Sequence, residues 1–502
     1  MRQNSGPTGP QRPGLAPCLV FIGLVVAVLG SLGAPLVPTV ASSGHVSYVA
    51  AQWTLTVSML AGAVTTPVFG KLGDGPRRKT VILMALSIVL AGCILAALPT
   101  GFGGLVAGRA LQGFGIGLTA LVIGVAHEAF EGAEARAVVG LLSVTAVAGV
   151  GVGYPLAGLA TRLWGLRGAY TSGAVVVGVA LVVGMLLLPN GSNKKPIRTD
   201  ILGAILLAVA VGGLLFAVSQ AATDVARVWV VVAAALGVVA GAIWVWWEFQ
   251  TSEPLVQLRL MKVPAVLAAN IAMLLGGIGV YLLISVAIRL VQTPTSSGYG
   301  IGASVITAGL MLTPFSATGF IASRTIPPLV QRSRGNLLLP AACGLVLLCL
   351  VAFAFLHGSL SEVFVVMTVA GYGVGALYAA VPGFIVRSAP PGTTTSAMSF
   401  NLVLATIGGA TGSAVSALVL QAATPHGAAI PTGRGYVVAA LVGAGVLAIA
   451  VLFSYLLRPR STYASSNEPD PPRMQGPQPC SPSRRTQLQY VLDSRNPRRI
   501  EE

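Results

Sequence analysis

Residues 70–80 read GKLGDGPRRKT and form a short charged segment between two long apolar runs. The segment holds four cations and one acid, Asp74, together with glycines and a proline that permit a tight reversal of the chain. Lys and Arg cross a bilayer only at high cost, so such a segment is typical of an aqueous turn between two membrane helices. The turn therefore predicts that its side of the membrane is the cytoplasm.

The composition indicates a polytopic membrane protein. Of 502 residues, 55% are hydrophobic and 9% are charged, and the mean hydropathy is +0.84. In soluble globular proteins about a quarter of residues are charged. The formal charge of +16 sits mostly in short loops and at the termini. This distribution argues against a nucleic-acid partner and favours anionic lipid headgroups.

The apolar runs predict an all-α fold of about fourteen membrane spans, because one span needs about 20 apolar residues. We expect the spans at residues 16–40, 46–72, 80–98, 104–126, 136–160, 168–188, 200–218, 225–247, 264–291, 303–323, 337–355, 361–386, 396–421 and 435–457. They divide the chain into a cytoplasmic N-terminus (1–15), a six-helix bundle (16–190), two additional helices with a linker (191–263), a second six-helix bundle (264–457) and a disordered basic tail (458–502).

The orientation follows from the positive-inside rule. With the N-terminus inside, sixteen Lys and Arg residues fall on the cytoplasmic side, and four fall outside, at Arg162, Arg167, Arg227 and Arg434. An even number of spans returns the C-terminus to the cytoplasm. The first apolar run has no clear small-residue cleavage site, which favours a retained helix over a signal peptide. We expect a multi-pass protein of the cell membrane.

The opening segment resembles the loop between the second and third helices of the major facilitator superfamily. Gly70, Leu72, Gly73, Asp74, Arg78 and Lys79 carry this resemblance. It implies two six-helix bundles around a central cavity, here with two extra helices. It also implies a conformational gate of Gly70, Gly73, Asp74, Arg78 and Lys79. The basic loop 320–336 occupies the matching place in the second half, as expected of a pseudo-symmetric transporter.

Arg109 lies inside the fourth span and is followed by Gln112 and Gly113 on the same helix face. An arginine at the centre of a span costs about 2.5–3.5 kcal/mol on insertion scales, so it needs a partner, a wet cavity or a route to the headgroups by snorkelling. The run Arg109-x-x-Gln112-Gly113-x-Gly115 resembles the fourth-helix motif of the same superfamily. The resemblance implies a role of Arg109 and Gln112 in proton coupling.

The fifth span contains a glycine-rich segment, Gly149, Gly153, Tyr154, Pro155 and Gly158. Glycines let a second helix approach closely, and Pro155 removes one helix hydrogen bond. Simple helix packing explains such a pattern equally well. The segment also resembles the antiporter motif of exporter families, with the proline one position later, and this implies export.

Two further segments, residues 51–54 (AQWT) and 399–413, resemble parts of the fourteen-helix drug/proton antiporters. Polar or aromatic groups inside apolar spans are costly or shape-specific. On this ground we expect Gln52, Trp53, Tyr281 and Asn401 to line the substrate cavity.

Acids are missing where related exporters often carry one. Residues 30–38 of the first span read GSLGAPLVP and contain no acid. Glu128, near the inner end of the fourth span, is therefore the remaining candidate carboxylate for proton coupling. Arg289, near the outer end of the ninth span, is expected to snorkel, and the alternative is that it faces the cavity. The five cysteines and four histidines show no disulfide or metal-ligand spacing, so no metal or cofactor is expected.

These features predict a monomeric secondary active transporter. We expect it to export hydrophobic or amphipathic small molecules, drugs or secondary metabolites, coupled to proton entry. Protons and membrane lipids are the expected partners besides the substrate. The sequence contains no recognisable catalytic constellation or phosphate loop, which argues against an enzyme. Two alternatives stay open: a proton-independent facilitator or uptake system, and a non-transporting sensor or scaffold. A pH gradient tests the first, and deletion of residues 461–502 tests the second.

Overall fold

The computed structural model describes residues 14–31, 33–73, 77–130, 132–189, 200–221, 226–252, 254–256, 258–330, 337–388, 394–425, 428 and 430–457. The chain divides into one unit of residues Met1–Arg458 and a second unit of residues Pro459–Glu502. The second unit, which contains the expected tail, lies outside the described residues, as does most of the expected N-terminal segment.

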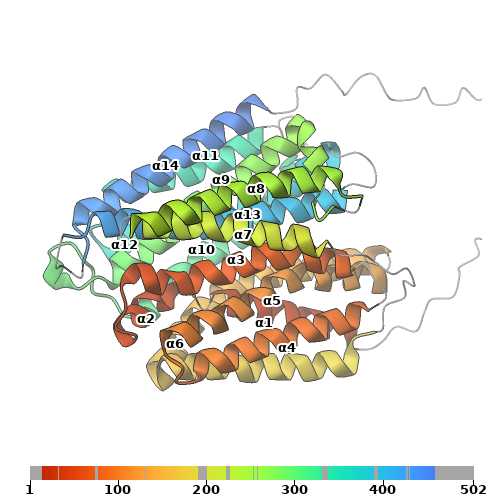
Figure 1. Cartoon of the computed structure of the whole chain (residues 1–502), viewed down its shortest axis with the longest axis horizontal. Helices are drawn as coiled ribbons and strands as arrows, with labels where there is room; N and C mark the ends of the chain where they lie inside the picture. The colour runs from red at the N-terminus through yellow and green to blue at the C-terminus, as the bar shows by residue number, and fades with distance from the viewer. Residues whose placement is uncertain are drawn as a thin grey trace, which may run out of the picture. The chain divides into compact units, whose positions relative to one another are not determined.

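The elements of the described chain are helices (Figure 1). The long helices are α1 (Leu15–Ser31), α3 (Tyr48–Gly73), α4 (Arg78–Ala97), α5 (Gly101–Ala129), α6 (Gly132–Leu187), α7 (Ile201–Gln220), α8 (Arg227–Gln250), α9 (Pro264–Gln292), α10 (Val305–Val330), α11 (Leu338–Phe355), α12 (Leu360–Ser388), α13 (Thr394–Ala422) and α14 (Gly433–Leu456). The short ones are α2 (Val37–Ser43) and the 3₁₀ helices η1 (Ala34–Leu36), η2 (Leu258–Lys262) and η3 (Thr295–Ser297).

The first expected span, residues 16–40, falls within one candidate membrane span, Leu15–Ser43. Its helix is interrupted, because α1 ends at Ser31 and η1 and α2 follow. Pro35 and Pro38 each occupy the start of one of these short helices, where a residue without an N–H is tolerated. The fifth and sixth expected spans, 136–160 and 168–188, lie on either side of Gly165 in α6, where φ is 70° and the backbone is non-helical, so two helices meet there at a kink. Glycine adopts this left-handed conformation at little cost.

Helix contacts repeat in the two halves of the unit, residues 15–187 and 264–456. In the first half α1 packs on α6, α3 on α5, and α4 on α6; in the second, α9 packs on α13, α10 on α12, and α11 on α14. The halves meet through α3 with α13 and through α6 with α10. Helices α7 and α8 pack on one another, and α7 also touches α3 and α13. We call the end of the bundle where α3 begins the Tyr48 end, and the opposite end the Lys71 end.

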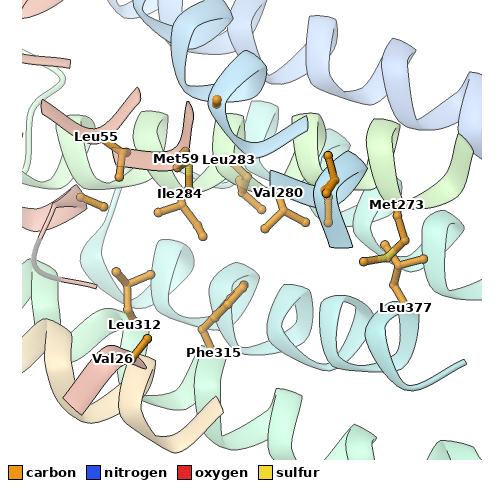
Figure 2. Packing of buried hydrophobic residues seen from close by; sticks show 14 of the residues in the cluster. Val26, Leu55, Met59, Met273, Val280, Leu283, Ile284, Leu312, Phe315 and Leu377 are labelled. Carbon is orange, nitrogen blue, oxygen red and sulfur yellow. The ribbon is translucent and has the colours of Figure 1, made fainter. Parts of the chain in front are cut away.

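Apolar side chains fill the region where the halves meet. Figure 2 shows Leu55 and Met59 of α3 with Val280, Leu283 and Ile284 of α9, all pointing toward Leu312 and Phe315 of α10 and Val26 of α1. These residues are buried and belong to one continuous hydrophobic cluster.

Twelve segments are long and apolar enough to cross a membrane, by length and composition and within the described residues. The protein is therefore a multi-pass membrane protein. Helix α3 and the first part of α6 are not among the twelve. Helix α3 is long enough, with 26 residues, but it carries buried polar side chains, including Gln52, Thr54 and Thr66. Its polar groups face protein rather than lipid.

Candidate functional site

Arg109 is fully buried and joins three helices of the first half. Its Nε donates to the carbonyl oxygen of Thr54 in α3 at 3.0 Å, and its Nη1 donates to Oε1 of Gln112 at 2.6 Å. Gln112 in turn donates from Nε2 to the carbonyl oxygen of Gly92 in α4 at 3.3 Å. Hydrogen bonds to a charged group contribute about 1.5–3 kcal/mol each. The snorkelling alternative for Arg109 is therefore wrong, because its exposed fraction is 0%.

The second guanidinium nitrogen of Arg109, Nη2, has no hydrogen-bond partner within the described part of the chain. It lies against Gly33, where an added Cβ would come within 2.6 Å of it. A glycine at this break between α1 and η1 thus leaves space for the guanidinium. Both hydrogen-bonded partners of Arg109 are uncharged, a backbone carbonyl and an amide. The cation keeps its charge without a counter-ion among these partners.

The other expected proton-coupling residue, Glu128, lies near the far end of α5. Nineteen residues of helix separate it from Arg109, which corresponds to about 28 Å along the axis. The side chain of Glu128 lies outside the described residues. The two candidates therefore do not form one contact site.

The four expected cavity residues face different neighbours. Gln52 is buried and donates from Nε2 to the hydroxyls of Ser285 at 3.2 Å and Ser413 at 2.5 Å, which joins α3 to α9 and α13 across the halves. Trp53 instead faces α7, where its ring centroid lies 6.1 Å from that of Phe216.

Tyr281 and Asn401 belong to the second half. The ring of Tyr281 lies against Gly409 of α13, where an added Cβ would be 2.8 Å from it. Asn401 is 4% exposed and donates from Nδ2 to the carbonyl oxygen of Ala269 at 3.1 Å and to Oδ1 of Asn270 at 3.0 Å. These bonds tie α13 to α9, so Asn401 serves packing within one half in this structure.

Arg289 contacts the other half of the unit at the Tyr48 end. Its Cζ lies 3.6 Å from the ring centroid of Tyr48, and the side chain is only 7% exposed. The prediction that Arg289 snorkels is wrong, because the arginine stacks on an aromatic ring of the other half. Beside it, Gln292 donates from Nε2 to the carbonyl oxygen of Pro35 at 3.2 Å, again across the halves. The sequence offered no signal for this pairing, since Tyr48 and Arg289 lie in helices far apart along the chain.

The expected gate lies at the Lys71 end. Gly70 and Gly73 are in the last turns of α3, whereas Asp74 lies outside the described residues. Arg78 is buried at the start of α4, and its Nη1 donates to the carbonyl oxygen of Gly124 in α5 at 3.1 Å. Lys79 donates from Nζ to the carbonyl oxygen of Met185 in α6 at 2.8 Å. Both bonds connect helices of the first half.

The glycine-rich segment of α6 lies in close backbone contact with two helices. A Cβ at Gly149 would lie 2.5 Å from the Cβ of Ala27 in α1. A Cβ at Gly158 would lie 2.9 Å from the Cα of Ile306 in α10, and one at Gly309 would lie 2.7 Å from the carbonyl oxygen of Tyr154. Gly153 and Tyr154 are buried, and Pro155 lies within the helix. This segment therefore packs α6 on α10 at the boundary between the halves.

One buried carboxylate was not singled out from the sequence. Glu248 was read as a polar residue after a span, but α8 continues to Gln250 and the side chain is 3% exposed. Its Oε2 accepts from the backbone N–H of Val256 at 3.1 Å. Nearby, Asp200 caps α7 by accepting from the N–H of Gly203 at 2.8 Å, and it accepts from Nε1 of Trp247 in α8. The sequence did hold a signal that the helix includes Glu248, because this residue directly follows an apolar run whose last four residues, 244–247, include three tryptophans.

No group of three or more His, Cys, Asp or Glu side chains in the described residues is placed to hold a metal ion. Four cysteines are free and buried, Cys18, Cys93, Cys343 and Cys349. The buried polar side chains of the described residues include arginines, amides, hydroxyls and the carboxylate of Glu248 in the last turn of α8. Such groups can bind, orient and gate a molecule between the two halves.

Known transporters share this arrangement. A solved structure of a POT family transporter in complex with a thioalcohol-conjugated peptide superposes with a TM-score of 0.64 at 13% identity, covering 90% of this chain and 99% of that one. The nucleoside transporter NupG superposes with a TM-score of 0.60 at 14% identity, covering 88% and 99%. At these identities the likeness shows the fold.

Sequence relatives add to the likeness. The multidrug resistance protein Stp of Mycobacterium tuberculosis is 26% identical over 380 residues, which cover 74% of this chain and 69% of Stp. The multidrug efflux pump LfrA of Mycolicibacterium smegmatis is 24% identical over 419 residues, covering 82% and 81%. The lincomycin resistance protein LmrB of Listeria monocytogenes is 27% identical over 277 residues, covering 54% and 56%.

A sequence model described as Major Facilitator Superfamily matches residues 19–294, which is more than half of the chain. With the helical architecture and the shared fold, this match shows that the chain belongs to the Major Facilitator Superfamily and is a secondary membrane transporter, not an enzyme.

Proposed function

We propose that this transporter exports hydrophobic or amphipathic small molecules, drugs or secondary metabolites, by alternating access, and that proton entry drives the export. The names of three relatives support export of drugs, since they describe a multidrug resistance protein, a multidrug efflux pump and a lincomycin resistance protein. The buried apolar side chains of α1, α3, α9 and α10 that lie together in Figure 2 support an apolar substrate.

The observation that carries alternating access is the set of side-chain contacts between the halves at the Tyr48 end. Arg289 stacks on Tyr48, and Gln52 donates to Ser285 and Ser413. Each of these contacts is a separable pair of side chains, and they add to the packing of α3 on α13 and of α6 on α10. Breaking them lets the halves part at this end without unfolding a helix.

For the membrane arrangement we propose fourteen spans, the twelve apolar segments together with α3 and the first part of α6. Both termini are cytoplasmic in this arrangement, and the Lys71 end faces the cytoplasm of a plasma-membrane monomer. The domain limits at residues 16–190, 191–263 and 264–457 follow from it. The gate is then the α3–α4 turn, with Gly70, Gly73, Asp74, Arg78 and Lys79.

Proton coupling is proposed to involve Arg109 and Gln112. A guanidinium does not lose its proton in proteins, so Arg109 acts on a neighbouring group or on the substrate through its charge rather than as the proton carrier. Its unpaired Nη2 is available for such an interaction. Removing the charge should abolish gradient-driven transport while the fold persists.

The test uses inside-out vesicles with and without an acidic lumen, and a matched panel of cationic, neutral and anionic fluorescent amphiphiles. Accumulation that requires both the protein and the gradient is expected for at least one class. Equilibration without accumulation would replace proton coupling by facilitated transport. Arg109→Ala should lose accumulation, and Arg324→Ala, which removes an exposed arginine of α10, should retain it. Equal activity of the two variants would refute the role of Arg109.

A further inference from the structure

Glu248 differs from the other carboxylates in its surroundings. The structure describes the side chains of four, Glu134, Asp200, Glu248 and Glu362, and of these Glu248 alone is buried. It lies in the last turn of α8, the second of the two helices between the halves. Burying an ionised carboxylate is costly unless the charge is paired or hydrogen-bonded, and a proton removes that cost. A buried acid at such a place needs a functional explanation.

The two oxygens of Glu248 differ. Oε2 accepts from the backbone N–H of Val256 at 3.1 Å, whereas Oε1 has no hydrogen-bond partner in the described part of the chain. Two of the other unpartnered buried polar atoms of the described residues lie close to it in sequence, Nε1 of Trp244 and Oγ1 of Thr251. Trp244 lies one helical turn before Glu248 in α8, and Thr251 is the residue that ends the helix. A proton on Oε1 can therefore be added without breaking the bond to Val256.

Charged groups of two other elements interact with Glu248, and a third element carries cations near the end of α8. Lys71 at the end of α3 and Asp200 at the start of α7 lie close enough to interact electrostatically with Glu248. Helix η2 contributes Arg259, whose Nη2 donates to the carbonyl oxygen of Phe249 at 3.2 Å, and Lys262 in the same turn. The carboxyl group is thus in contact with the connection that leads to α9 and within electrostatic reach of α3. Helix α3 belongs to the first half, and the connection leads into the second.

We propose that Glu248 is a proton-binding site at the Lys71 end, and that its charge sets how firmly residues 254–256 and α3 are held to α8. A carboxylate accepts a backbone hydrogen bond roughly twice as strongly as a neutral oxygen does, and it attracts Lys71. When a proton from the aqueous phase at this end binds Oε1, both interactions weaken, and the proton leaves when the carboxylate re-forms. The site makes the opening of the Lys71 end pH-dependent.

The first test needs no substrate. Infrared difference spectra of the purified full chain in lipid are recorded while pH is stepped through the neutral range, and they report the C=O stretch of neutral carboxyl groups. Wild type should show a carboxyl that loses its proton in this range, and Glu248→Gln should lack it. Glu362→Gln is the matched control, because Glu362 also accepts a backbone N–H, from Gly358 at 2.9 Å, but is not buried. The same signal in Glu248→Gln as in wild type would overturn the proposal.

The second test rests on the proposed function, because it measures transport against pH on the Lys71 side in vesicles. Wild type and Glu362→Gln should keep a pH-dependent rate, Glu248→Gln should lose that dependence while still transporting, and Glu248→Asp should regain it. An unchanged profile in Glu248→Gln would overturn the proton site and leave the exporter intact. Absence of transport in wild type would instead refute the exporter, and the infrared titration would still decide the proton site.

Discussion

Removing the ring of Tyr48 should open the Tyr48 end. The charge of Arg289 lies 3.6 Å from the centre of this ring, and the arginine is 7% exposed, so the cation–π contact is largely desolvated. Such contacts contribute about 1–2 kcal/mol, which corresponds to about a five- to thirty-fold change in an equilibrium constant. Tyr48→Leu should therefore raise the population open at this end by about that factor. Tyr48→Phe keeps the ring and is the matched control.

The assay is the rate at which a maleimide added on the Tyr48 side modifies a cysteine placed at Ser285. This residue is 5% exposed and hydrogen-bonded to Gln52 between the halves. All variants share the Ser285→Cys and Cys480→Ser background, and the four described native cysteines are buried. When opening and closing are fast compared with modification, the rate is proportional to the open population. If Tyr48→Leu is modified no faster than Tyr48→Phe, the stacked pair does not hold this end closed.

Two further predictions concern packing. Gly158→Ala should lower the melting temperature and slow transport, because the new Cβ would lie 2.9 Å from the Cα of Ile306. Overpacking of this kind costs about 1–3 kcal/mol of stability. Gly178→Ala in α6 is the control, since its Cβ would meet no atom within 4 Å, and it should behave as wild type. Asn401→Leu should lower the free energy of unfolding by about 1–3 kcal/mol, because Oδ1 of Asn270 loses its hydrogen-bond donor. The double variant with Asn270→Leu should lose less stability than the two single variants lose in sum.

Apolar runs were a sufficient guide to most helices, because a span needs about 20 apolar residues and few other segments satisfy that requirement. The first run differs because backbone geometry, not hydropathy, decides there. Pro35 and Pro38 stand at the starts of η1 and α2, which interrupt this run. Hydropathy is insensitive to that effect, whereas the gap expected between the fifth and sixth runs contains the non-helical Gly165 of α6. The prediction of two additional helices, α7 and α8, is confirmed, because both are apolar runs of at least 20 residues.

Site residues were harder to predict because their roles depend on contacts between distant helices. The spacing of Arg109 and Gln112 put them on one helix face, and the structure places a 2.6 Å hydrogen bond there. Asn401 was chosen as a cavity residue because it is polar in an apolar span, but its donors are satisfied within the second half. Glu248 was passed over because the fold-back of the connection to Val256 cannot be read from composition.

Helix α3 links the two ends of the proposed cycle. It carries Tyr48 and Gln52 at one end and Lys71 at the other, and it continues as a helix through Pro67. The 23 residues from Tyr48 to Lys71 span about 35 Å. Because the helix is continuous, a tilt that breaks the Arg289 contact at one end also moves Lys71 relative to Glu248 at the other. The Arg289 contact contributes about 1–2 kcal/mol. Loss of the Tyr48 ring therefore changes the ratio of the two states by about five- to thirty-fold, and under the proposal a proton at Glu248 shifts the same ratio from the other end.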